Sequence, residues 1–326
     1  MDFSVAICTY NGATRIPEVL EALQAQTQLG AIAWEILVVD NNSTDDTAAV
    51  VARYAQAWSL PHSEIRYCFE GRQGVTYARQ RAVAEARSDL IGFLDDDNLP
   101  DPTWVAAAHA FGQSHPQAGA YGAIVRAKLD APPPDYFEQA KNLIAIQDRG
   151  PEPFCYQRTA KPRRIPIAPG SVVRKQAWQQ SLPPRLLLGG RDEKHQTFLG
   201  SCEDLEVLYY IQNGPWEVWH NPAMVVWHHI PPHRFEAAYL RKLARTSGLS
   251  NHALRIARWQ QPWQRALMPV LTLGYGVVDA YKVAAFYLQF RGQLAADPGK
   301  AWEMEARLGR LLSPWMFWGR RREEGQ

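Results

Sequence analysis

The stretch Leu90-Ile91-Gly92-Phe93-Leu94-Asp95-Asp96-Asp97-Asn98 joins an apolar run of strand length directly to three consecutive aspartates. Other apolar runs precede it, and segments with apolar residues at helical spacing separate them. This alternation is typical of a parallel sheet covered by helices on both faces. The strand-like runs are 3–8, 34–39, 65–69 and 90–94, and the helical segments are 15–26, 46–58 and 75–87.

Polar residues follow each of these predicted strands. In sheets of this kind, ligands bind beyond the carboxyl ends of the strands, so these residues are the candidates for a binding site. They are Thr9-Tyr10-Asn11-Gly12, then Asp40 to Asp45, then Gly71-Arg72-Gln73-Gly74, and finally Asp95 to Asn98.

The aspartate triplet 95–97 predicts a cation site. Three adjacent carboxylates repel one another unless they are solvated or bind a cation, and oxygen ligands suit Mg²⁺ or Mn²⁺. The alternative is a solvated loop in which Asp101 caps the next helix. Asp40 ends the second strand, where its carboxylate can accept a hydrogen bond from a base or a ribose. Ser43 and Asp45 are expected only to cap the following helix.

Four blocks together resemble the family 2 glycosyltransferases with the GT-A fold, in their order and spacing over residues 3–128. A fifth block, 200–206, is similar to the acidic element that begins a helix in that family. The blocks are Thr9-Tyr10-Asn11, Val39 to Asp45, Gly74 to Arg79, Phe93 to Asn98 and Gly200-Ser201-Cys202-Glu203-Asp204-Leu205-Glu206.

The resemblance implies an α/β fold of the GT-A nucleotide-diphospho-sugar transferase type, with a mixed, mainly parallel sheet flanked by helices. The expected domain is 1–234, with a nucleotide-sugar-binding part at 1–128 and an acceptor and catalytic part at 129–234. The segment 235–326 is expected to be a C-terminal helical extension that starts with a helix over 235–259. The Pro- and Gly-rich stretch 130–164 is expected to be a long loop, with order resuming over 165–174.

The resemblance also implies roles for individual residues. Thr9, Tyr10, Asn11 and Asp40 would line the nucleoside pocket, Arg79 would lie near the base or the diphosphate, and Asp96 is counted with the donor-binding residues. Asp95 and Asp97 would form the metal-binding element, with Asp97 as the direct ligand. Either His228 or His229 could complete the metal shell, and His228 is preferred. Asp204 would be the catalytic base, with Glu203 as its nearest rival.

The chemistry of glycosyl transfer explains these residue types. A divalent cation stabilises the charge that grows on the diphosphate leaving group, and Arg79 could add fixed positive charge. A carboxylate on the other side of the sugar would take the proton of the acceptor hydroxyl, and direct displacement inverts the anomeric centre. The start of a helix favours the ionised form of such a base. Without the resemblance, Glu203 and Asp204 would be interpreted as an acidic pair that stabilises the helix.

Residues 268–290 are strongly apolar but carry Asp279 and Lys282 near their middle. Each central charge costs roughly 2.5–3.5 kcal/mol in a membrane span, so an interfacial or protein-packed helix pair is expected instead. The tail 315–322 combines aromatic and cationic residues that suit a lipid headgroup surface, the alternative being a frayed, exposed terminus.

The composition of the chain bears on its partners, its cysteines and its location. The 35 Lys and Arg residues nearly balance the 33 Asp and Glu residues, which gives no general attraction to nucleic acid. The four scattered cysteines indicate reduced thiols. No secretory signal pattern is present at the N-terminus, so a cytoplasmic location is expected, with peripheral contact to the cytoplasmic face of the inner membrane.

The sequence therefore predicts an enzyme, a glycosyltransferase that uses Mn²⁺ or Mg²⁺. It would move a sugar from a nucleotide-diphosphate donor, with a UDP-sugar favoured, to an acceptor hydroxyl on a glycan or lipid-linked glycan. Its product would be a polysaccharide or glycolipid. Two alternatives remain: transfer to a polyprenyl phosphate, and a non-catalytic sugar-nucleotide-binding protein.

Overall fold

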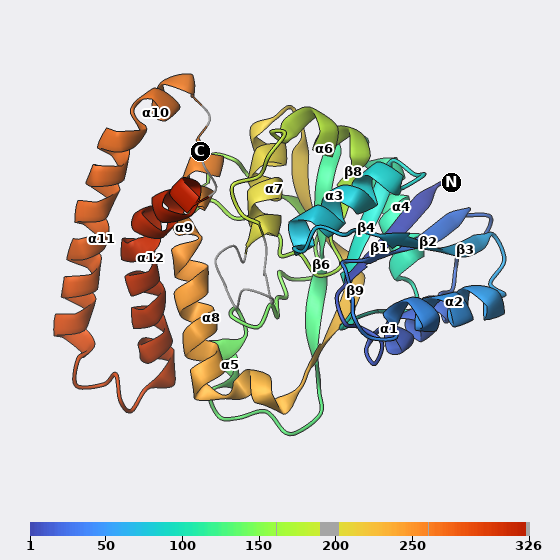
Figure 1. Cartoon of the computed structure of the whole chain (residues 1–326), viewed down its shortest axis with the longest axis horizontal. Coiled ribbons are helices and arrows are strands. Elements are labelled where there is room, and N and C mark those ends of the chain that lie inside the picture. Colours follow the sequence, from blue (N-terminus) through green and yellow to red (C-terminus); the bar gives the residue numbers. More distant parts are fainter. Residues whose placement is uncertain (161, 190–201, 260, 324–326) are drawn as a thin grey trace. The chain divides into compact units, whose positions relative to one another are not determined.

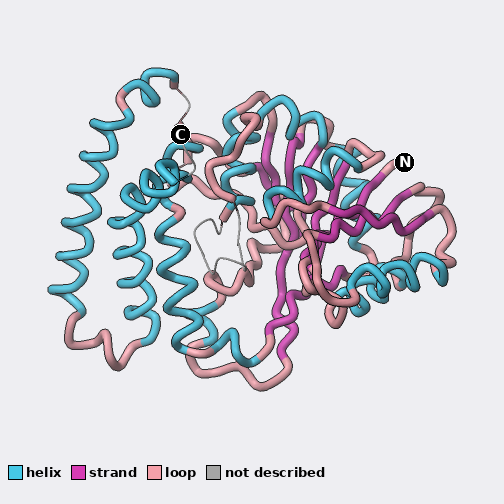
Figure 2. The backbone as a smooth tube through the Cα atoms, viewed as in Figure 1, coloured by secondary structure: helices cyan, strands magenta, loops and turns pink. Residues whose placement is uncertain are grey.

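The computed structural model describes residues 1–160, 162–189, 202–259 and 261–323, and for 320–323 it describes the backbone alone. The chain divides into two compact units. The first unit comprises 1–128, 145–186 and 210–230, and the second comprises 129–144, 187–209 and 231–326. Figure 2 shows that the strands gather in one part of the chain and that the C-terminal region is built from helices and loops.

In the described part of the chain, nine strands form one mixed sheet in the first unit. Its order is β3-β2-β1-β4-β8-β6-β9-β5, and β7 pairs with β9 beside this path. Figure 1 labels β1 to β4, β6, β8 and β9 of this sheet. The strands are β1 (Phe3–Thr9), β2 (Trp34–Asp40), β3 (Ser63–Phe69), β4 (Leu90–Asp95), β5 (Asn98–Pro100), β6 (Ala118–Leu129), β7 (Phe154–Cys155), β8 (Val172–Arg174) and β9 (Glu217–Ile230).

The parallel part of this sheet is formed by β3, β2, β1 and β4. The pairs β4–β8, β6–β8, β5–β9 and β7–β9 are antiparallel. All seven residues of β2 are buried, as expected for a parallel strand covered on both faces. The sequence predicted all four parallel strands and the mixed character of the sheet.

Helices cover both faces of the parallel strands. Alternate residues such as Phe3, Val5 and Ile7 belong to one hydrophobic cluster, because successive side chains of a strand point to opposite faces. Residues of α1, α2 and α4 complete this cluster, and α3 packs against β1 and β2. The helices are α1 (Ile16–Gln24), α2 (Thr47–Ala57), α3 (Val75–Glu85), α4 (Trp104–Ser114) and α6 (Lys175–Ser181), with α7 (Glu203–Asn213) joining the two units.

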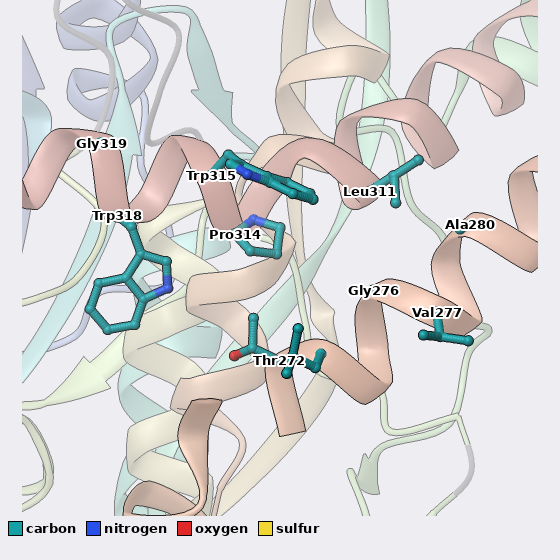
Figure 3. A pocket seen from close by; sticks show the side chains of 10 residues that line it. Thr272, Gly276, Val277, Ala280, Leu311, Pro314, Trp315, Trp318 and Gly319 are labelled. Carbon is teal, nitrogen blue, oxygen red and sulfur yellow. The ribbon is translucent and has the colours of Figure 1, made fainter. Parts of the chain in front are cut away.

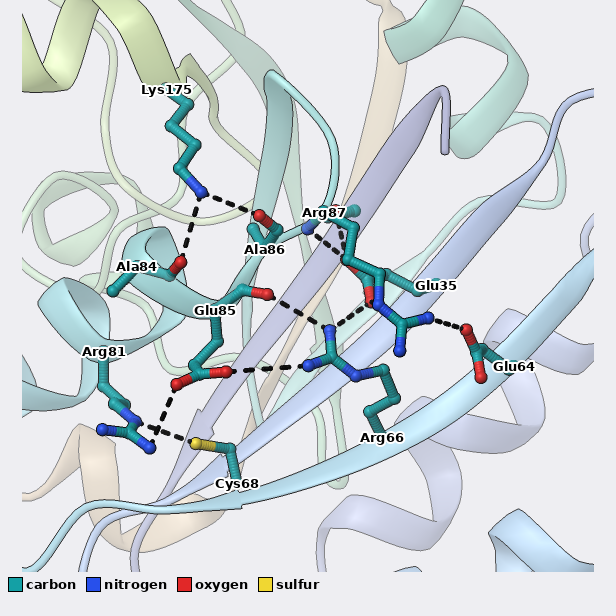
Figure 4. A network of polar contacts seen from close by, with 11 residues as sticks. Glu35, Glu64, Arg66, Cys68, Arg81, Ala84, Glu85, Ala86, Arg87 and Lys175 are labelled. Carbon is teal, nitrogen blue, oxygen red and sulfur yellow. Dashed lines mark hydrogen bonds and ion pairs between the residues drawn. The ribbon is translucent and has the colours of Figure 1, made fainter.

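A buried carboxylate ties the sheet to the end of α3 (Figure 4). Glu35 has no exposed surface, and it accepts hydrogen bonds from Ser4 Oγ at 2.7 Å, Arg66 Nη1 at 2.6 Å and the Arg87 backbone N–H at 2.7 Å. Burial alone would raise the pKa of Glu35, but these bonds outweigh it and hold the pKa below its ordinary value. Glu35 therefore stabilises the fold as an ionised group.

The second unit is helical in its described residues. It contains α5 (Phe137–Ala140), the 3₁₀ helix η1 (Pro232–Phe235), α8 (Ala237–Leu249), α9 (Asn251–Ala257), α10 (Pro262–Ala266), α11 (Met268–Phe290) and α12 (Pro298–Glu323). Helices α8 and α12 approach closely at two glycines: a Cβ added to Gly309 would lie 2.3 Å from the Arg245 carbonyl oxygen and 2.9 Å from Gly248 Cα.

Several sequence predictions need correction. Residues 268–290 form one 23-residue helix rather than a helix pair, because their proline lies in the first turn and the charge of Asp279 is neutralised by Arg255. The single helix predicted for 235–259 is interrupted at Ser250, between α8 and α9. Of the ordered run predicted at 165–174, only Val172–Arg174 is a strand. None of the described helices is both long and apolar enough to cross a membrane.

Candidate active site

The carboxyl ends of β2, β1 and β4 bring the predicted donor-binding residues side by side. Thr9 on β1 is the register partner of Asp40 on β2, and Cys8 is the partner of Asp95 on β4. Neighbouring strands lie about 4.8 Å apart, so the backbones of Asp40 and Asp95 are separated by about 10 Å. This edge of the sheet is where a nucleotide would lie in a fold of this kind.

Asp40 is held in a fixed orientation at this edge. Its side chain is buried, one oxygen accepts the Ser43 N–H at 2.9 Å, and the other accepts the Tyr67 hydroxyl at 2.8 Å. Burial raises the pKa of Tyr67, and the hydrogen bond to Asp40 raises it further, so this hydroxyl stays a donor. Tyr67 could not be predicted from the sequence, because its contact with Asp40 depends on the register between β2 and β3.

Two asparagines order the loops around Asp40. The Asn11 side-chain oxygen accepts the Thr44 N–H at 2.8 Å, and the Asn11 N–H donates to Ser43 Oγ at 2.9 Å. Asn41 donates to the carbonyl oxygen of Arg72 at 2.7 Å and accepts the Gly74 N–H at 2.7 Å. Asn11 and Asn41 thus join the three loops that follow β1, β2 and β3.

Asp45 also bridges two loops. Its carboxylate accepts the N–H of Ala13 at 3.1 Å and the N–H of Thr47, the first residue of α2, at 3.1 Å. Burial pushes the pKa of Asp45 upward, but these hydrogen bonds and that of the Thr47 hydroxyl outweigh it and lower the pKa. The capping role expected for Asp45 is therefore present, together with a contact to the loop after β1.

Asp96 makes internal contacts. It accepts the Thr9 hydroxyl at 2.6 Å and two guanidinium N–H bonds from Arg15, at 3.0 and 2.8 Å. The same guanidinium donates to the Tyr10 carbonyl oxygen at 3.1 Å. A Cβ on Gly12 would lie 1.9 Å from Thr9 Oγ1, so glycine is needed for this approach. Thr9 and Asp96, both predicted to bind the donor, are hydrogen-bonded to each other.

Asp95 is the more exposed carboxylate of the triplet. Its side chain is 40% exposed, and one oxygen lies 3.5 Å from the Arg79 guanidinium. Arg79 extends from α3, is largely buried, and has its guanidinium 5.7 Å from the centre of the Phe93 ring. A buried cation beside an accessible carboxylate gives this part of the edge both an anion-binding and a cation-binding group.

Asp97 faces a histidine from a distant part of the chain. Asn98 on β5 is the register partner of His228 on β9, which brings His228 Nε2 to 3.5 Å from Asp97 Oδ2. The other oxygen of Asp97 accepts the Asn98 side-chain N–H at 2.9 Å. The pairing of β5 with β9 thus brings Asp97 and His228 together.

His229 points to a different group. Its Nδ1 lies 3.9 Å from Glu18, which also contacts Lys128. Its backbone N–H donates to the Asp97 carbonyl oxygen at 2.9 Å. Of the two histidines considered from the sequence, His228 is therefore the one whose ring lies beside the triplet.

The pair Asp97 and His228 fits a divalent cation. Two ligands at right angles on an ion with bonds of about 2.1 Å are separated by about 3 Å, close to the observed 3.5 Å. Across the described residues, no group of three or more His, Cys, Asp or Glu side chains is arranged around a common metal position. Two protein ligands leave room for phosphate oxygens and water, which Mg²⁺ commonly keeps.

The acidic residues of the fifth block begin α7, as predicted. Glu203 is largely buried and Asp204 is half-buried, and both lie in the second unit, whereas the triplet lies in the first. Glu206, one turn later, is fully buried and accepts the N–H groups of Leu187 and Leu188, each at 2.8 Å. Glu206 therefore orders the chain before α7. The residues Gly200 and Ser201 of this block lie outside the described residues.

Known proteins resemble this chain in sequence and in fold. The model of the family Glycosyl transferase family 2 matches residues 4–181, which include β2 to β8 and all of β1 except Phe3. The poly(ribitol-phosphate) beta-N-acetylglucosaminyltransferase TarS of Staphylococcus aureus is 30% identical over 115 residues, 35% of this chain and 19% of that protein. The matched segment thus spans about a fifth of the length of this relative.

Two solved structures share the fold. The mannosyltransferase PcManGT of Pyrobaculum calidifontis, solved with GDP-Man and Mn²⁺, superposes with a TM-score of 0.59 at 18% identity, covering 97% of this chain and 87% of that one. S. aureus TarS 1–349 with UDP gives a TM-score of 0.50 at 18% identity, covering 100% and 92%. These likenesses confirm the predicted GT-A-type α/β fold with C-terminal helices.

Proposed function

Because the chain belongs to Glycosyl transferase family 2, we propose that it transfers a sugar from a nucleoside-diphosphate donor to an acceptor hydroxyl. The observation that carries this proposal is the set of side chains at the carboxyl edge of β2, β1, β4 and β5. Asp40 is a fixed hydrogen-bond acceptor, Arg79 is a buried cation, and Asp97 lies beside His228. In a nucleotide-sugar complex, Asp40 would bind the base or ribose and Arg79 would lie near the diphosphate. Asp97 and His228 would bind the cation.

Asp40 would bind the nucleoside. Its two oxygens are already oriented by Ser43 and Tyr67, so binding a ring N–H or a ribose hydroxyl costs little side-chain entropy. Tyr10 and Asn11, on the loop after β1, would complete the pocket. Thr9 and Asp96 would contribute indirectly, by holding that loop through Arg15.

Asp97 and His228 would hold a divalent cation, with Mn²⁺ or Mg²⁺ as the candidates, and Asp95 would contact it or the water bound to it. Bound there, the cation would stabilise the charge that develops on the departing diphosphate. Arg79 would add a fixed positive charge next to Asp95, in a site where protein dipoles replace water. Support for a metal also comes from PcManGT, which was solved with Mn²⁺.

Asp204 would be the general base, with Glu203 as the alternative. Both lie in the first turn of α7, where the helix dipole favours the ionised carboxylate that a base requires. Abstraction of the acceptor proton on the face opposite the diphosphate would give inversion at the anomeric carbon.

The acceptor is proposed to be a glycan or lipid-linked glycan of a cell-surface polymer. TarS, named for its action on poly(ribitol-phosphate), supports a polymeric acceptor. One structural neighbour was solved with UDP and the other with GDP-Man, so uracil and guanine are both candidate bases of the donor. A UDP-sugar is favoured, and the experiment distinguishes the two.

Helix α11 would dock on a lipid surface. Its exposed stripe is apolar: Val270, Leu273, Val277, Tyr281 and Leu288 are each 65–73% exposed. Between residues 251 and 296 the only acidic residue is Asp279, which is buried and paired with Arg255. The outward charges on this segment are therefore basic, which complements an anionic membrane.

Thermal unfolding and donor turnover test the proposed activity. UDP or GDP with Mn²⁺ should raise the melting temperature more than either component alone, in proportion to affinity. Wild-type protein should then release the nucleotide slowly from the matching nucleotide sugar. No stabilisation by either nucleotide and no turnover with any donor would refute the proposal.

Two variants assign the roles. Asp97→Asn should abolish the effect of Mn²⁺ on nucleotide binding, whereas Asp204→Asn should keep nucleotide binding and lower turnover by about 10²–10⁴-fold. The matched control is Asp46→Asn, an exposed aspartate whose side chain makes no capping bond to α2. Full turnover by Asp204→Asn with a polyprenyl phosphate would favour that acceptor, since it is already anionic. Donor binding without turnover would favour a non-catalytic protein.

A further inference from the structure

An apolar groove of about 770 Å³ runs between α11 and α12 (Figure 3). Its lining contains a single polar side chain, Thr272, and two indoles, Trp315 and Trp318. The remaining lining residues are Leu273, Gly276, Val277 and Ala280 of α11 and Leu311, Pro314 and Gly319 of α12. Residues 272–280 span about 12 Å of helix, so the groove is long enough for a segment of an extended lipid chain.

The groove is closed at one end. Beyond Ala280 and Leu311 the two helices pack directly, with the Arg307 guanidinium 4.5 Å from the centre of the Phe286 ring. The Lys300 ammonium lies 3.9 Å from the Phe290 ring in the same packed half. The groove is therefore apolar along its length, and the Arg307 guanidinium lies beyond its closed end.

Positive charge exceeds negative charge at this closed end. The carboxylate of Asp279 is used by Arg255, through bonds of 2.7 and 2.9 Å, and Glu303 pairs with Arg307. Arg310 directly precedes the groove residue Leu311. Among the described residues, no hydrogen bond or ion pair engages its guanidinium.

The surroundings of Arg310 favour an added anion. Arg310 has an exposed side chain, but the protein around its guanidinium excludes part of the solvent and so lowers the pKa of Arg310. The positive charges of Arg255, Arg307 and Arg258 lower this pKa further by repulsion. The carboxylate of Asp279 has the opposite effect. An anion placed among these cations would relieve the repulsion. A guanidinium also binds phosphate oxygens in a favourable planar geometry.

We infer that this groove binds a long-chain lipid phosphate, with the apolar chain between α11 and α12 and the phosphate on Arg310. The inference rests on the proposed function in one respect, that the lipid carries the acceptor glycan. A second copy of this chain is the alternative occupant, which the binding and light-scattering measurements distinguish.

Two glycines of α11 supply a matched pair of variants. Gly276 lines the groove and Gly274 does not, and a Cβ at either position would meet no atom within 4 Å. Gly276→Leu therefore places a leucine in the groove with its Cβ clear of other atoms, and Gly274→Leu places the same side chain elsewhere on α11. Both changes improve helix propensity equally, so a difference in binding reports on the groove.

The experiment measures binding of farnesyl phosphate to the full chain by calorimetry, with farnesol and inorganic phosphate as comparison ligands. Farnesyl phosphate should bind to wild type and to Gly274→Leu alike, and about tenfold or more weakly to Gly276→Leu. Arg310→Gln should reduce binding of farnesyl phosphate about tenfold and leave farnesol unchanged. Inorganic phosphate alone should not compete at equal concentration.

Equal binding to Gly276→Leu and Gly274→Leu would overturn the inference, as would equal binding of farnesyl phosphate and farnesol. A wild-type dimer that Gly276→Leu dissociates, seen by light scattering, would overturn it in favour of a second copy. Donor turnover by wild type separates the two proposals. Turnover without lipid binding removes the groove proposal alone, and lipid binding without turnover removes the proposed function alone.

Discussion

The three aspartates at the end of β4, Asp95 to Asp97, should differ in their contributions to stability, and Asp96→Asn tests this. Asp96 accepts three hydrogen bonds, one from Thr9 and two from Arg15, which fasten the loop after β1 to the triplet. In the variant, an amide NH₂ replaces one acceptor oxygen of the carboxylate. One donor of Arg15 or Thr9 would then face another donor.

The magnitude follows from these contacts. A hydrogen bond to a charged group contributes about 1.5–3 kcal/mol, but the Arg15 side chain is 44% exposed, so solvent screening reduces its share. We therefore expect a loss of about 2 kcal/mol. For a cooperative unit of 150–250 residues this lowers the melting temperature by about 4–8 °C.

Asp95→Asn is the comparison variant, because Asp95 is 40% exposed and its contact with Arg79 is 3.5 Å long. Its melting temperature should change by about 1–2 °C, since surface substitutions usually stay within about 0.5 kcal/mol. Calorimetric melting of both proteins without ligands is the assay. If Asp95→Asn were the less stable of the two, the assignment of Asp96 as the anchoring residue would be wrong.

Three further outcomes are expected. Glu35→Gln should lose about 3 kcal/mol at pH 7, seen in urea unfolding. Because the folded pKa of Glu35 is lowered, its contribution is complete above an unfolded pKa of about 4.3 and is lost below it, so the variant and wild type should converge towards pH 3. Gly309→Ala should lower the melting temperature of the helical unit, since its Cβ would lie 2.3 Å from a carbonyl oxygen. Gly12→Ala should displace Thr9 and weaken nucleotide binding about tenfold by calorimetry; unchanged affinity would show that this loop does not order the pocket.

The parallel half of the fold could be predicted because each strand carries its own signal. The runs at 3–8, 34–39, 65–69 and 90–94 correspond to β1, β2, β3 and β4, and polar residues mark where each ends. The order of strands and helices along the chain is enough to predict that the polar residues ending these strands lie at the same edge of the sheet. The later, antiparallel strands pair over long sequence separations, and β8, with three residues, has too short a pattern to locate.

The candidate site could be predicted as a set of residues, but their contacts could not. Adjacent aspartates in a turn point in different directions, and only the positions of Arg15 and His228 distinguish Asp96 from Asp97. The bond between Tyr67 and Asp40 likewise depends on cross-strand register. The interruption at Ser250 and the continuity of α11 were missed because tertiary contacts, not local propensity, decide them.

Electron paramagnetic resonance of Mn²⁺, titrated into the protein with UDP or GDP, is the most direct test of the central proposal. The wild type should bind one Mn²⁺ in the presence of nucleotide, and Asp97→Asn and His228→Ala should each weaken that binding at least about tenfold. Asp46→Asn should bind Mn²⁺ as the wild type does. Mn²⁺ binding that is the same in all four proteins would contradict the assignment of Asp97 and His228 as the cation site.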